Sequence, residues 1–64
     1  MIIRKLPPDS VIEHQTFEKF VIFESPHPSQ VLWRVTIRNC VFREGFHIGS
    51  DAKYCTFEGN MVGR

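Results

Sequence analysis

This sequence lacks long apolar runs, and it contains few strong helix formers and few cysteines. Its longest apolar run covers only the four residues from Phe20 to Phe23, too few to cross a bilayer. One alanine and two leucines argue against extended helices, whereas the many Phe and β-branched residues favour strands. Two cysteines without a CxxC spacing exclude a disulfide scaffold and the common zinc motifs.

The chain also lacks an excess of charge of either sign. Eight Lys and Arg residues oppose seven Asp and Glu residues, which gives a formal net charge of +1. General attraction to nucleic acid needs net or clustered positive charge, and a protein that mimics DNA needs an acidic bias. The first residues, in which Arg4 and Lys5 directly follow Ile3, do not resemble a signal peptide. We therefore expect a cytoplasmic or virion-associated protein with no membrane partner, and nucleic acid is not the favoured partner.

What the sequence does have is an apolar residue at nearly every fifth position. Ten of these thirteen positions are apolar, and the exceptions are Pro7, His27 and His47. Neither a helix nor a flat strand produces a period of five, whereas a solenoid of short stacked units does. The series is Ile2, Pro7, Ile12, Phe17, Ile22, His27, Leu32, Ile37, Phe42, His47, Ala52, Phe57 and Val62.

The period predicts an all-β fold, a short right-handed parallel β-helix of about three coils with an irregular loop on one face. Strand-like runs cover residues 16–24, 31–42 and 53–58, and two prolines within residues 25–29 require a loop. All 64 residues form one small domain, in which residues 1–9 are expected to act as an N-terminal cap. Such a domain is only marginally stable unless a disulfide, a metal or oligomerisation supports it.

Four five-residue sides give about twenty residues per coil, and residues twenty apart are then expected to stack. The predicted columns are Ile12, Leu32 and Ala52; Phe17, Ile37 and Phe57; Ile2, Ile22, Phe42 and Val62; and Pro7, His27 and His47. The small residues two positions before these centres, from Val35 to Cys55, are expected to fill a second inward position. Phe42 and Phe57 are both expected to lie in the core.

Residues 40–44 (CVFRE), 50–54 (SDAKY) and 55–59 (CTFEG) carry a small residue first and an apolar residue at the centre. In this respect the chain resembles the pentapeptide-repeat family over residues 30–60. The family's repeat implies a four-sided right-handed β-helix. Residues 45–49 depart from the pattern, so we expect the side of Pro7, His27 and His47 to be bulged or looped. A fifteen-residue alternative, which aligns residues 40–45 with 55–59, resembles three-sided β-helices of the pectate-lyase type.

Two functions beyond simple association remain open. Some pentapeptide-repeat proteins imitate DNA and bind type II topoisomerases, so the resemblance implies DNA gyrase modulation as one alternative, testable by a supercoiling assay. Single-stranded nucleic-acid binding is the other, because basic side chains lie among aromatic ones in the sequence. These residues are Arg34, Arg38, Arg43 and Lys53, with Trp33, Phe46 and Tyr54. Interspersed acidic residues argue against the second alternative, and salt-insensitive binding would dismiss it.

The residues that carry chemistry do not form a recognisable catalytic or metal motif. Cys40 and Cys55 are expected to act as small buried residues. The three histidines share no predicted column with a carboxylate or thiol, and no spacing enforces a nucleophile–base pair at Ser10, Glu13 and His14. We expect no enzyme activity, no cofactor and no metal.

The leading prediction is therefore a non-enzymatic protein for protein–protein interaction or assembly. It would act as an oligomer or as a small component of a larger assembly, and small β-helical accessory proteins of bacteriophages look similar. An outward Trp33 would form an exposed aromatic patch with Phe23, Phe46 and Tyr54, and the end near Val62 shows no cap. The predicted interface residues are Trp33, Phe46, Tyr54, Met61 and Val62.

Overall fold

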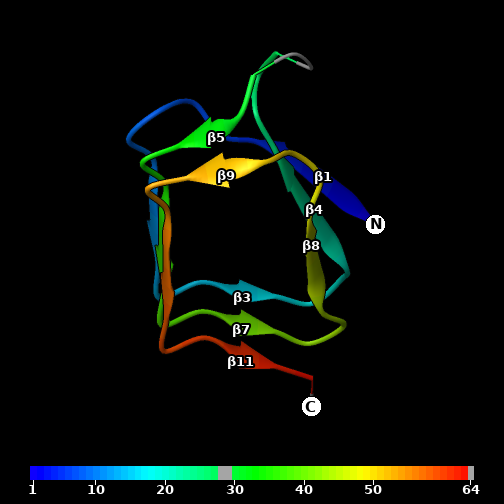
Figure 1. Cartoon of the computed structure of the whole chain (residues 1–64). Helices are drawn as coiled ribbons and strands as arrows, with labels where there is room; N and C mark the ends of the chain where they lie inside the picture. The colour runs from blue at the N-terminus through cyan, green and yellow to red at the C-terminus, as the bar shows by residue number, and fades with distance from the viewer. Residues whose placement is uncertain (28–29, 64) are drawn as a thin grey trace.

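The computed structural model describes residues 1–27 and 30–63, and in that range it contains eleven short strands and no helix (Figure 1). The strands are β1 (Ile2–Lys5), β2 (Val11–Glu13), β3 (Thr16–Phe17), β4 (Val21–Glu24), β5 (Leu32–Trp33), β6 (Thr36–Arg38), β7 (Val41–Phe42), β8 (Phe46–Ile48), β9 (Ala52–Lys53), β10 (Thr56–Glu58) and β11 (Met61–Val62). The predicted all-β class is confirmed. Pro28 and Ser29 of the predicted proline loop lie outside the described residues.

The strands form four short sheets in which every pairing is parallel. Three sheets have three strands, in the orders β1–β4–β8, β2–β6–β10 and β3–β7–β11, and the fourth pairs β5 with β9. Consecutive strands of the chain therefore lie in different sheets. From β2 onward the chain returns to the same sheet after four strands, so β8 lies beside β4 and β11 beside β7 (Figure 1).

The register of the strands confirms the twenty-residue spacing in the second half of the chain only. Leu32 pairs with Ala52 and Ile37 with Phe57, both twenty residues apart. Ile12, however, pairs with Ile37 rather than with Leu32. The pairings that span the connection between β4 and β5 are twenty-five residues apart because this connection adds five residues. Ile2 pairs with Val21, nineteen residues away, so the predicted column of Ile2 and Ile22 is wrong by one residue before that connection. A fifteen-residue spacing does not occur among the pairings of the described strands.

Apolar residues at the period-five positions form much of the core. Ile37 and Phe42 are completely buried, and the small-position residues Val35 and Cys40 are buried beside them, as predicted. The rings of Phe17 and Phe42 stack with centroids 5.2 Å apart, and Phe23 packs edge-on against both. Removing such side chains from water is the main favourable contribution to folding.

The β1–β4–β8 sheet reverses the predicted pattern of inward and outward residues. In β4 the neighbours Val21 and Phe23 are fully buried, while the period-five residue Ile22 lies between them on the other face. Two predictions are therefore wrong. His47 lies in a regular strand beside Ile22 rather than in a bulged face with Pro7 and His27, and Phe23 does not face outward. Alternating apolar residues bury more surface here than the period-five residue alone would.

Residues in the left-handed backbone region form two of the corners between sheets. His14, Asn39 and Gly59 occupy one corner, with φ angles of 57°, 54° and 64°. Asn and Gly adopt this conformation readily, because glycine has no Cβ and a short polar side chain can form local hydrogen bonds. The second such corner contains Asp9, Arg34 and Tyr54.

Candidate functional site

The two ends of the stacked strands differ in how well the core is covered. At the end formed by β1, β2 and β3, Ile12 and Phe17 are 8% and 7% exposed, although no further strand lies beyond them among the described residues. The Arg4 guanidinium lies 5.8 Å from the centre of the Phe17 ring, and Leu6 is buried nearby. These side chains cover the core over β2 and β3, whereas Ile2 in β1, which pairs with the fully buried Val21, is 37% exposed.

The opposite end leaves its inward apolar residues uncovered. We call the last strand of each sheet, β8, β9, β10 and β11, the C-terminal edge. Phe57 in β10 is 40% exposed although its neighbour Ile37 is fully buried, and Val62 in β11 is 60% exposed beside the fully buried Phe42. The two residues of each pair are neighbours in one sheet. The edge residue is more exposed than its neighbour because the described chain places no strand over the C-terminal edge.

A row of aromatic rings runs through the core to this edge. Phe17 stacks on Phe42, Phe42 lies 4.5 Å from Phe46, and Phe46 lies 6.4 Å from Phe57, measured between ring centroids. Phe57 is the last ring of the row, and its outer side faces solvent. The C-terminal edge is therefore the open end of the aromatic core.

The backbone of the C-terminal edge also presents unpaired hydrogen-bonding groups. Thr56 N–H donates to Val35 C=O, and Met61 N–H donates to Cys40 C=O. Alternate residues of a parallel strand bond to opposite neighbours, so the N–H and C=O groups of Phe57 and Val62 point away from the sheet. Such groups are a template for pairing with another strand.

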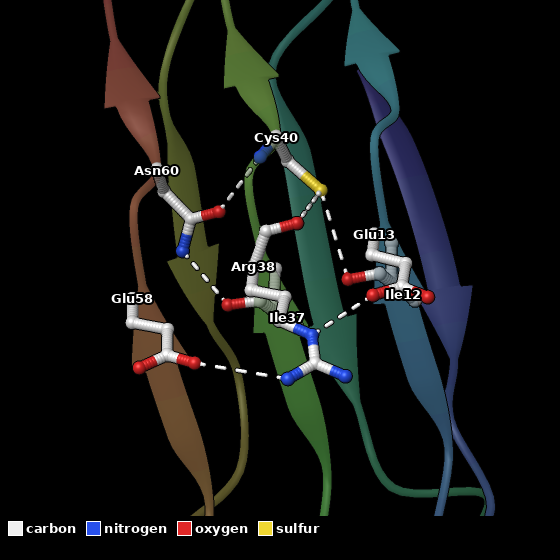
Figure 2. Close-up of polar contacts among 7 residues, drawn as sticks. All are labelled: Ile12, Glu13, Ile37, Arg38, Cys40, Glu58 and Asn60. Carbon is white, nitrogen blue, oxygen red and sulfur yellow. Dashed lines mark hydrogen bonds and ion pairs between the residues drawn. The ribbon is translucent and has the colours of Figure 1, made fainter.

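Asn60 holds β10 and β11 in position through its side chain (Figure 2). Its Oδ1 accepts a hydrogen bond from the Cys40 backbone N–H at 3.0 Å, and its Nδ2 donates to Ile37 C=O at 2.9 Å. On the outer surface Arg38 lies between Glu13, at 2.8 Å, and Glu58, at 3.8 Å. The sequence marked Asn60 only as a small-position residue, because a period-five pattern cannot show a hydrogen bond to another strand.

The predicted interface residues fall into separate groups. Met61 and Val62 lie exposed on β11. Trp33 is half-buried, its ring lies edge-on to the exposed Tyr54 with centroids 5.0 Å apart, and both belong to the side of the β5–β9 sheet. Phe46 is half-buried against the core rather than in an outward patch with Trp33. Phe57 was not among the predicted interface residues, although it is the second-last residue of the period-five series.

The basic and aromatic residues proposed for nucleic acid are only partly grouped. Arg38 and Arg43 form ion pairs with Glu13 and Glu18, the latter at 3.0 Å. Arg34 lies 5.7 Å from the Trp33 ring centre, and Lys53 is in the same sheet. The backbones of Asp9 and Asp51 hydrogen-bond to β5, so two acidic residues lie on strands or turns next to this one.

The residues with possible chemistry are engaged in structural contacts. The Ser10 hydroxyl donates to Pro7 C=O at 2.6 Å, and Glu13 binds Arg38. Both thiols are free, with Cys40 Sγ 3.3 Å from Arg38 C=O and Cys55 half-buried. Within residues 1–27 and 30–63 there is neither an enclosed cavity nor a group of three His, Cys, Asp or Glu side chains suited to a metal.

No protein-family model, curated protein or solved structure matches this chain. The resemblance to pentapeptide-repeat proteins therefore depends on the motif residues alone. No helix that could cross a membrane occurs in the part of the chain that the structure describes.

Proposed function

We propose that this chain is a short right-handed parallel β-helix of about three coils, built like a pentapeptide-repeat protein, and that it acts by binding other protein chains. Support for the coil comes from four parallel sheets visited in turn and from paired residues that lie nineteen, twenty or twenty-five positions apart. The proposed role is a non-enzymatic one, in an oligomer or a larger assembly. In it, residues 1–9 serve as the N-terminal cap.

The observation that carries this proposal is the exposure of Phe57 and Val62 beside fully buried neighbours. Apolar area contributes about 25 cal/mol per Å² when it is removed from water, so covering this edge is favourable. A partner strand would also satisfy the outward backbone groups of both residues. At the opposite end Ile12 and Phe17 are only 8% and 7% exposed, although Ile2 is 37% exposed. The C-terminal edge, where Val62 is 60% exposed, is the less covered end and is the one proposed as an interface.

Hydrogen exchange at low and high protein concentration tests this proposal. The amide hydrogens of Phe57 and Val62 face the C-terminal edge, and we expect their exchange to slow several-fold as concentration rises, because association buries them. The amides of Ile3 and Val11 face the opposite edge and serve as the internal control, since their exchange should not change. Equal protection of both edges, or none at either, would contradict the proposed interface.

A further inference from the structure

The size of the face presented by the C-terminal edge limits which partners could form a stable interface with it. Three layers of strands about 4.8 Å apart account for the shortest extent of the molecule, 13 Å, so the stacking direction is the thin one. The remaining extents, 33 by 21 Å, set an upper bound of roughly 700 Å² on the area of this face. Stable interfaces bury about 800 Å² per partner, so a partner must cover nearly the whole face. A partner with a face of the same shape meets this requirement.

We infer that the partner at the C-terminal edge is a second copy of this chain, related by a twofold axis that passes midway between the Phe57 residues of the two copies. This inference rests on the proposed function and specifies its partner. A twofold axis of this kind sets β10 antiparallel to the partner's β10. The outward N–H of Phe57 then donates to the C=O of the partner's Phe57, and its C=O accepts from the partner's N–H, as in a hydrogen-bonded antiparallel pair. The two exposed rings meet, and the aromatic row of each copy continues into the other.

The charges on the outer face of β10 favour this arrangement over stacking head to tail. In the antiparallel pairing Glu58 lies opposite the partner's Thr56, a neutral hydroxyl. In a head-to-tail stack β10 would continue the sheet onto the next copy's β2, which by the register of this sheet places Glu58 against Glu13. Like charges directly opposite each other destabilise a strand pair. The twofold arrangement also closes at two copies, whereas head-to-tail stacking has no natural end.

Charge substitutions at Thr56 test the pairing, with dimerisation measured by analytical ultracentrifugation at low salt. Thr56 is exposed and faces outward, so its replacement should leave each chain folded. Thr56→Lys places a cation opposite Glu58 of the partner twice per dimer, and we expect the dimer to tighten by about fivefold. Thr56→Glu should weaken the dimer by a similar factor. The double variant Thr56→Glu/Glu58→Lys should restore it, which a purely local effect on one strand would not do.

Two other results would overturn the inference in recognisably different ways. If Glu58→Lys alone strengthens association and the mass grows beyond two chains, the copies stack head to tail and only the twofold pairing is wrong. If the Thr56 variants leave association unchanged while Phe57 and Val62 amides are still protected with concentration, the C-terminal edge binds in another register. In both cases the proposed function stands; an absence of concentration-dependent protection at this edge removes the function and the inference together.

Discussion

Replacing Phe42 with alanine is expected to lower the free energy of unfolding by about 3–5 kcal/mol, the range for deleting a buried aromatic side chain. Phe42 is completely buried, and its ring contacts Phe17, Phe23 and Phe46. The loss combines the transfer energy of the ring with the cavity left among these neighbours. A 64-residue domain has roughly 3–10 kcal/mol of stability in total, so we expect much of the variant to be unfolded at 25 °C. Urea denaturation followed by circular dichroism measures the change.

The adjacent substitution Arg43→Asp is the control for this experiment. Arg43 is exposed and pairs with Glu18 on the surface, and exposed ion pairs contribute at most about 1 kcal/mol. We expect its urea midpoint to stay close to that of the wild type. Similar losses from Phe42→Ala and Arg43→Asp would mean that the core does not lie where the structure places it.

Replacing Asn60 with leucine is expected to lower the free energy of unfolding by about 1–3 kcal/mol, although it adds apolar surface. The Asn60 side chain is the hydrogen-bond acceptor for the Cys40 N–H, and leucine leaves that buried donor without a partner. The bond from Nδ2 to Ile37 C=O is lost as well. The urea midpoint, measured at a concentration low enough to keep the chain monomeric, gives the size of the effect.

Asn60→Asp separates the two hydrogen bonds of this side chain. The carboxylate keeps an acceptor for the Cys40 N–H but has no donor for Ile37 C=O. We expect a stability between those of the wild type and Asn60→Leu. If Asn60→Leu is as stable as the wild type, the side chain does not hold β10 and β11 together.

The period of five was enough to predict an all-β chain and the pairings after Leu32. It also placed Ile37 and Phe42 in the core, because residues at this spacing return to the same side. The columns that span the proline-containing loop between β4 and β5 were wrong because this loop interrupts the period, and the column of Ile2 and Ile22 was wrong by one residue before it. The prolines in the sequence show where the loop lies. The number of residues that it adds to the repeat follows only from the pairing of β4 with β8 and of β5 with β9.

The sequence was less informative about the candidate interface. It treated Phe42 and Phe57 as equivalent core residues, yet one lies inside the stack and the other at its edge. Burial at the end of a repeat depends on what lies beyond the last strand, which a repeat pattern does not encode. The same limit applies to Phe46, whose inward position follows from the pairing of β8 with β4.

The most direct test of the account is the solution mass of the wild type and of Val62→Asp, by light scattering coupled to gel filtration. We expect the wild type to approach twice the 7.5 kDa of one chain as concentration rises. Val62→Asp should remain near 7.5 kDa yet stay folded, because Val62 is exposed in the single chain and an unpaired charge is costly only in the interface. Ile3→Asp, at the opposite end, should behave as the wild type does. A wild type with the mass of one chain at every concentration, or a Val62→Asp variant that associates equally well, would contradict the assignment of the C-terminal edge as the interface.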